Sequence, residues 1–429
     1  MPTTRPPRFV LQLLIVIACA VTATRAEAAG ARISIACGAL GVELTLCREA
    51  AGDWARQTGN SVSIINTPNS SSDRFALYVQ LLASRSPEID VLQIDVVWPG
   101  MLAPHLADLG PAFADRTPEM FPALVDNDTV DGRLVAIPWY VDAGVLYYRS
   151  DLLEKHGFAP PRTWEELTHT AGAIQQRERA AGHGELWGFV FQGKPYEGLT
   201  CDALEWVASR NGGTFIDGSG EITANNPRAA AALRLAADWI GTIAPRGVLN
   251  YDEEAARGVF QTGKAVFMRN WPYAWALAQS AGSPVRGKVG VIALPRGGPD
   301  GRHAGTLGGW QLAVSRYSRH PDEAIDLVRH LTSAQTQKTR AIRGAYNPTI
   351  MALYRDPDIL EANPFFGTLL PTFMDALPRP ARQTGVHYNQ VSAAIWQAVH
   401  SVLSGDVDAS QGLERLQESL ERIRYRARW

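Results

Sequence analysis

Three short stretches decide the fold: ARISIAC (31–37), SVSIIN (61–66) and IDVLQIDVV (89–97). Each is rich in β-branched residues and has the length of a strand, and glycine or polar residues bound it. The third is apolar almost throughout, as expected of a strand that is covered on both faces. The sequence therefore predicts three buried strands within the first hundred residues.

Two helices are expected between these strands. Residues 43–57 have helical apolar spacing, and Thr58-Gly59-Asn60 ends the helix. The run from Ser70 to Asp73 supplies capping chemistry for a second helix, whose apolar face would be formed by Phe75, Tyr78, Val79 and Leu82. Strand–helix–strand–helix–strand order predicts a parallel, doubly wound α/β sheet, in which ligands bind at the carboxyl ends of the strands.

The same alternation continues to the C-terminus without a free linker. About 400 residues are more than one hydrophobic core usually holds, so two domains are expected. Further helices are predicted at 151–157, 163–180, 229–240, 253–260, 322–331 and 411–424, and strands at 288–294 and 311–314. The pattern favours two α/β lobes that exchange strands.

The first 28 residues are typical of a cleaved signal peptide. Arg5 and Arg8 precede an apolar run of about 13 residues from Phe9 to Val21, and small residues follow. A membrane-spanning helix needs roughly 20 apolar residues. Two alternatives stay open: a retained anchor, and a lipoprotein acylated at Cys19. Either form of export predicts a periplasmic protein.

Composition excludes several classes of partner. The chain carries 41 basic and 43 acidic residues, a net charge of -2, with no basic stripe that would indicate nucleic acid or anionic lipid. Neither His nor Cys recurs at metal-ligand spacing, so no metal or other cofactor is expected. In an oxidising compartment, Cys37 and Cys47 are close enough in sequence to form a disulfide between a strand end and a helix. Cys201 is expected to be a buried free thiol.

Aromatic residues gather in three stretches that also contain glycine, proline or polar residues. These are 138–144 (PWYVDAG), 269–275 (RNWPYAW) and 306–310 (TLGGW). A pyranose has apolar faces and a rim of hydroxyls, so it needs aromatic rings together with polar partners. Any single Trp can equally be a core residue. The polar candidates are Glu43, Arg74, Asp95, Asp142 and Arg379, each of which could instead cap a helix or lie in solvent.

An enzyme is the less favoured hypothesis. The chain has no G-x-S-x-G elbow, phosphate loop or H-E-x-x-H helix. A secreted glycosidase built from two carboxylates stays open, because sequence cannot exclude a pair that meets only in space.

Several long stretches, in order, carry a family resemblance. They are 90–98 (DVLQIDVVW), 138–153, 191–198 (FQGKPYEG), 269–275, 306–310 and 377–380 (LPRP). In these the chain resembles the extracellular solute-binding proteins, family 1, of ABC sugar importers, and most closely the trehalose/maltose-binding branch.

The resemblance implies a two-lobed periplasmic-binding-protein fold with a hinge and a sugar in the cleft between the lobes. The N-terminal lobe would comprise residues 29–139 and about 305–345, and the C-terminal lobe 140–304 and about 346–429. Ligand contacts would fall on Glu43, Arg74, Asp95, Tyr140, Asp142, Trp271, Tyr273, Gly309, Trp310 and Arg379. The protein would be a monomer that captures a disaccharide and delivers it to a permease in the inner membrane. Another glycoside or a polyol remains an alternative cargo.

Overall fold

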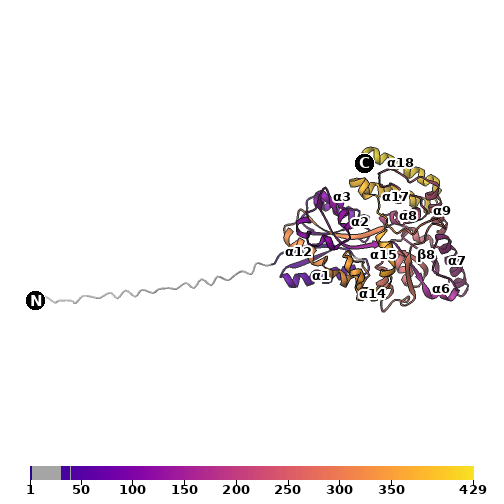
Figure 1. Ribbon diagram of the computed structural model, residues 1–429, viewed down its shortest axis with the longest axis horizontal. Coiled ribbons are helices and arrows are strands. Elements are labelled where there is room, and N and C mark those ends of the chain that lie inside the picture. The colour runs from indigo at the N-terminus through magenta and orange to yellow at the C-terminus, as the bar shows by residue number, and fades with distance from the viewer. Residues whose placement is uncertain (2–29, 39) are drawn as a thin grey trace.

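The computed structural model describes Met1, residues 30–38 and residues 40–429 (Figure 1). The expected signal peptide and Cys19 lie outside the described residues. Two main sheets organise the chain, and each is the centre of one lobe. Figure 1 shows α1, α2, α3 and α12 on one side of the molecule, and α6 to α9 with α17 and α18 on the other. The α/β class and the two lobes are thus confirmed.

The first sheet contains five strands in the order β2-β1-β3-β11-β6. All three strands predicted from the first hundred residues belong to it, and β1 pairs in parallel with both β2 and β3. The strands are β1 (Arg32–Cys37), β2 (Ser61–Asn66), β3 (Val91–Asp95), β6 (Ile137–Ala143) and β11 (Leu307–Val314). β11 runs antiparallel to both β3 and β6. Since the strands between β6 and β11 in the chain belong to the other sheet, β11 brings the chain back to the first one.

Short helices and turns cover this first lobe. Ser70 caps α2 by accepting a hydrogen bond from the Asp73 N–H, as predicted. Tyr78 and Leu82 are buried on that helix, whereas Val79 is 43% exposed, so its assignment to the apolar face is wrong. The elements are α1 (Glu43–Thr58), α2 (Ser71–Ala83), α3 (Pro99–Leu102), α4 (Gly110–Phe113), α5 (Pro122–Asn127), α12 (Pro321–Leu331), α13 (Ala334–Gly344) and the hairpin of β4 (Thr129–Val130) and β5 (Arg133–Leu134).

The second sheet contains four strands in the order β10-β7-β9-β8. They are β7 (Val145–Arg149), β8 (Trp187–Val190), β9 (Ala265–Asn270) and β10 (Val289–Ala293). The helices that follow or precede them are α6 (Ser150–His156), α7 (Trp164–Ala180), α8 (Glu197–Ser209), α9 (Pro227–Trp239), α10 (Glu253–Gln261) and α11 (Ala274–Ala278). Thr163 caps α7, and its hydroxyl accepts a hydrogen bond from the Glu166 N–H.

The C-terminal helices divide between the two cores. Phe366 and Phe373 of α15 (Phe365–Met374) belong to the core cluster that contains the five-stranded sheet. Val399 and Leu420 belong to the core cluster of the second lobe. The remaining helices are α14 (Pro357–Ala362), α16 (Ala381–Thr384), α17 (Tyr388–Leu403) and α18 (Ala409–Ala427).

Three segments of the described chain connect the two lobes, and two of them link the sheets. β6 ends at Ala143 in one sheet and β7 begins at Val145 in the other, so the first change comes at Gly144 rather than between residues 139 and 140. The chain returns through Thr306 into β11. Thr306 forms a β-bridge with Leu377. The third connecting segment, at Leu377, therefore lies beside the second, at Thr306.

Candidate functional site

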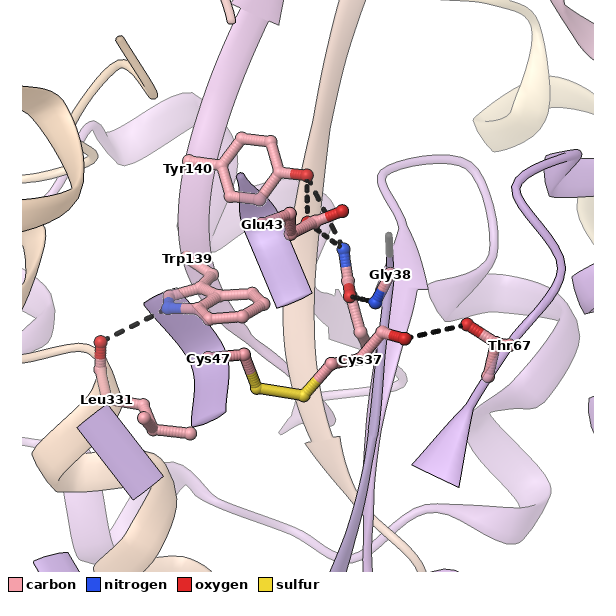
Figure 2. Close-up of a disulfide and its surroundings, with 9 residues drawn as sticks. Cys37, Gly38, Glu43, Cys47, Thr67, Trp139, Tyr140 and Leu331 are labelled. Atoms are coloured by element: carbon pink, nitrogen blue, oxygen red, sulfur yellow. Dashed lines mark hydrogen bonds between the residues drawn. A yellow bond between two sulfur atoms is a disulfide. The ribbon is translucent and has the colours of Figure 1, made fainter. Parts of the chain in front are cut away.

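The first wall of the interlobe cleft is built where β1 and β3 end. Glu43, in the first turn of α1, is fully buried. It accepts hydrogen bonds from the Gln93 amide at 2.6 Å and from the Tyr140 hydroxyl (Figure 2). A disulfide between Cys37 and Cys47 joins the end of β1 to α1, the helix that carries Glu43, as the sequence predicted (Figure 2).

Asp142 lies next to the first crossing of the chain. It is 6% exposed, lines the cleft, and its Oδ1 has no hydrogen-bond partner within the described residues. Burial and the nearby charge of Glu43 together raise the pKa of Asp142 to about 8, against the opposing charges of Arg269 and Arg340. A carboxyl oxygen of this kind can accept a hydroxyl hydrogen from a ligand in either protonation state.

Trp310 forms the aromatic part of the first wall. β11 pairs Trp310 with Asp95 on one side and Tyr140 on the other, so sheet register brings these three together. The Arg74 guanidinium lies 4.2 Å from the Trp310 ring centroid, and its Nε and Nη2 donate to the Pro68 carbonyl at 3.1 and 3.0 Å. Arg74 is fully buried, so it supports the ring from behind.

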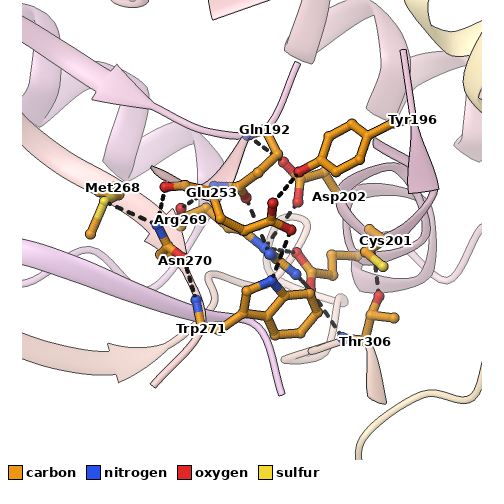
Figure 3. Close-up of polar contacts among 11 residues, drawn as sticks. Gln192, Tyr196, Cys201, Asp202, Glu253, Met268, Arg269, Asn270, Trp271 and Thr306 are labelled. Atoms are coloured by element: carbon orange, nitrogen blue, oxygen red, sulfur yellow. Dashed lines mark hydrogen bonds and ion pairs between the residues drawn. The ribbon is translucent and has the colours of Figure 1, made fainter. Parts of the chain in front are cut away.

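The second wall comes from the other lobe. The Trp271 indole N–H donates to Glu253 at 3.3 Å, and the Tyr196 hydroxyl donates to the same carboxylate at 2.7 Å (Figure 3). Tyr273 follows in the same turn and donates to Glu254 at 2.8 Å. Burial raises the pKa of Glu253, and its hydrogen bond from Tyr196 opposes the rise.

Arg379 joins the two walls. Its Nη2 lies 2.9 Å from Asp95, at the end of β3, and its Nη1 lies 2.6 Å from Glu197, at the start of α8. The Glu197 backbone N–H also donates to the Ser72 hydroxyl at 3.2 Å. Burial raises the pKa of Glu197, and the positive charge of Arg379 opposes it. These contacts hold the cleft closed.

The expected ligand residues therefore fall into two groups. Those that line the cleft are Asp95, Tyr140, Asp142, Trp271, Tyr273, Gly309, Trp310 and Arg379. Glu43 and Arg74 lie behind them, in contact with Tyr140 and Trp310. Gly309 has a φ of +123°, and a Cβ there would lie 2.5 Å from the Tyr140 carbonyl, so this position requires glycine for its backbone.

Several residues of the cleft are not predicted as ligand contacts by the sequence. They are Leu40, Asn69, Ser71, Glu197, Gly198, Cys201, Glu253, Gly308 and Tyr346. The sequence pattern indicates Glu253 only as the first residue of a helix, where acidic side chains are common. Cys201 is the buried free thiol that the sequence predicted.

Comparison with known proteins identifies the family. A model of bacterial extracellular solute-binding proteins matches residues 46–338. The chain belongs to that family. It is 51% identical to a probable ABC transporter-binding protein of Deinococcus radiodurans, over 94% of this chain and 96% of the relative. The resemblance found in the sequence is thereby confirmed.

Solved structures agree with this membership. Maltose-bound MalE3 of T. maritima superposes with a TM-score of 0.88 at 42% identity, and covers 92% of this chain and 100% of its own. A solute-binding protein of Agrobacterium vitis with bound D-mannitol shares the fold at a TM-score of 0.80 and 22% identity, over 93% of this chain and 99% of its own. The family member described here is the substrate-binding component of an ABC sugar transporter.

The family's members bind solutes rather than transform them, and its extracellular designation implies a periplasmic or extracellular location. Among the described residues, no helix is long and apolar enough to cross a membrane. Nor do three His, Cys, Asp or Glu side chains in that part of the chain converge as a metal site would require.

Proposed function

We propose that this protein captures a disaccharide of the maltose or trehalose type between Trp310 and Trp271. The supporting observation is the pairing of one tryptophan from each lobe with acidic groups around them, above all the unpartnered Oδ1 of Asp142. Aromatic rings suit the apolar faces of a pyranose, and the carboxylates suit its hydroxyls. The similarity over nearly the whole chain to a protein solved with maltose gives independent support.

Binding is coupled to closure in this proposal. The lobes would comprise 29–139 with about 305–345 and 140–304 with about 346–429, with the first boundary moved to Gly144. Sugar binds to one wall of an open cleft, and closure adds the contacts of the other wall, which shifts the population toward the closed form. The loaded monomer then delivers its sugar to an inner-membrane permease. Residues 1–28 would direct export to the periplasm.

A polyol is the alternative ligand, and it is suggested by relatives that share the fold. Relatives with the same fold are solved with D-mannitol and ribitol, and a mannitol-binding protein of Pseudomonas aeruginosa is 24% identical to this chain. A linear polyol has no ring face to stack, so it gains less from the two tryptophans that line the cleft. The aromatic pair therefore favours a disaccharide.

Calorimetric titration tests the proposal directly. We expect maltose or trehalose to bind more tightly than sucrose, mannitol or ribitol. Trp310→Ala should weaken sugar binding by at least about 2 kcal/mol while the protein stays folded, since it removes a buried aromatic contact. Equal affinity of wild type and variant would refute the site, and preference for mannitol would replace the disaccharide by a polyol.

A further inference from the structure

Arg269 is the centre of a buried ionic cluster directly behind the second wall. It lies on β9 and is fully buried. Its Nε and Nη2 donate to the two oxygens of Glu205 at 2.9 and 2.5 Å, and its Nε lies 3.0 Å from Asp202 (Figure 3). Its Nη1 donates to Gln192 at 3.1 Å. A bidentate pair of this kind fixes both position and orientation of the guanidinium.

One side of this cluster faces the two crossing segments. Glu205 accepts a hydrogen bond from the Thr306 backbone N–H at 3.0 Å, on the segment that returns to the first sheet. At the first crossing, a Cβ on Gly144 would lie 2.0 Å from Glu205 Oε1 and 2.6 Å from Arg269 Nη2. The backbone of Gly144 therefore lies against the ion pair, and only glycine fits there.

The other side of the cluster faces the cleft. The Arg269 guanidinium lies 4.0 Å from the Trp271 ring centroid, in cation–π geometry. The edge of the same ring meets β11, since a Cβ on Gly308 would lie 2.9 Å from Trp271 Cζ3. One face and one edge of the indole are thus held by the protein.

We propose that Arg269 is a positioning residue for ligand binding: it orients Trp271 and, through Glu205, ties that ring to the two crossing segments of the hinge. The role rests on the proposed sugar site, and it adds a direct route from the ligand contact to the hinge. A purely stabilising role is a poorer explanation, because buried ion pairs often contribute little compared with apolar residues of the same volume. Lysine cannot replace the planar fork of arginine.

The test compares two arginines with the same geometry. Arg149 in the same lobe forms a bidentate pair with Asp151, at 2.7 and 2.6 Å, away from the cleft. We expect Arg269→Lys to weaken sugar binding about tenfold and Arg149→Lys to leave it unchanged. In a Trp271→Leu background, which lacks the aromatic ring, Arg269→Lys should cost less than about threefold, because its effect passes through the ring. Equal costs in both backgrounds would overturn the proposal.

Hydrogen exchange without sugar tests the link to the hinge separately. Arg269→Lys should speed exchange of the Thr306 amide about tenfold or more, since Glu205 loses its fixed orientation. Arg149→Lys should leave that amide unchanged. Unchanged exchange in Arg269→Lys would overturn the hinge link. If the wild type bound no sugar at all, the proposed function would fail, while the exchange result would still decide whether Arg269 holds the hinge.

Discussion

The two walls of the cleft present similar groups but are held in place differently. In both walls a buried arginine lies against a tryptophan. In the first wall, the backbone carbonyl of Pro68 holds Arg74, and a disulfide joins the end of β1 to α1. In the second wall, two carboxylates from a distant helix hold Arg269, and no disulfide is present in the described part of that lobe. The first wall therefore combines an arginine with a local covalent link, whereas the second depends on buried ion pairs.

Because of this difference, breaking the disulfide and removing a buried charge should affect different walls of the cleft. Reduction of the disulfide should act on the first wall, and loss of a buried charge should act on the second wall or on the contact between the two. The predictions below follow from that distinction, with the largest effect first.

Arg379→Met should have the largest effect, because it removes the side chain that joins the walls. Asp95 and Glu197 would then face each other in the closed cleft without a cation, which costs about 3 kcal/mol in buried settings. Calorimetry should show sugar affinity reduced by roughly that free energy. Arg382→Met, on an exposed neighbour, is the matched control and should bind normally. Equal affinities would show that Arg379 does not join the walls.

Removing the disulfide should cost slightly less, and mainly in stability. Cys37→Ser with Cys47→Ser releases a short loop, which corresponds to about 2–3 kcal/mol in the free energy of unfolding. Denaturant unfolding measures it, and exchange at Thr306 should stay as in the wild type. A change at Thr306 would mean that the walls are not held independently.

Asp142→Asn should make the sugar-free protein more stable at high pH. The pKa of Asp142 is raised to about 8 in the closed cleft, whereas the usual value is near 4. The folded chain therefore binds a proton that the unfolded chain has released, so this group lowers stability as pH rises from about 4 to about 8. Asparagine removes that loss, so the stability of the variant relative to wild type should rise by about 2 kcal/mol between pH 6 and pH 8. Thermal unfolding at several pH values checks it, and parallel curves would contradict it.

Gly308→Ala should have the smallest effect, of about 1 kcal/mol on sugar binding. The new methyl would meet the Trp271 ring at 2.9 Å and displace it, a modest overpacking. Gly258→Ala in α10 is the control, since nothing lies within 4 Å of a Cβ there. It should leave affinity unchanged and stabilise the helix slightly. Normal binding by Gly308→Ala would show that the ring tolerates movement.

The local pattern was sufficient to predict much of the first lobe. β1, β2 and β3 and the cap at Ser70 are all where the sequence suggested, because strands and caps depend on neighbouring residues. The prediction that Val79 is buried is wrong because the buried face of a helix depends on which elements pack against it. The helical spacing of apolar residues does not show those elements.

The site was only partly accessible from sequence for the same reason. Trp139 and Tyr140 are adjacent where the pairing of β6 with β11 is irregular, and their ring centroids lie only 5.8 Å apart, yet only Tyr140 lines the cleft. Trp139 is buried against Arg340. Likewise Tyr196 and Trp271 position Glu253. Ser72 and Arg379 contact Glu197 from parts of the chain that are distant in sequence. The aromatic stretches and polar candidates of the sequence already included Trp310, Asp95 and Arg379, but only the family resemblance, and no local pattern, indicated that they meet in one cleft.

A crystal structure of the protein with maltose or trehalose would test the central claim most directly. The account predicts a disaccharide in the interlobe cleft, with one ring against Trp310, one against Trp271, and a hydroxyl donated to Asp142. Sugar density that contacts neither tryptophan, or that lies outside the cleft, would contradict it.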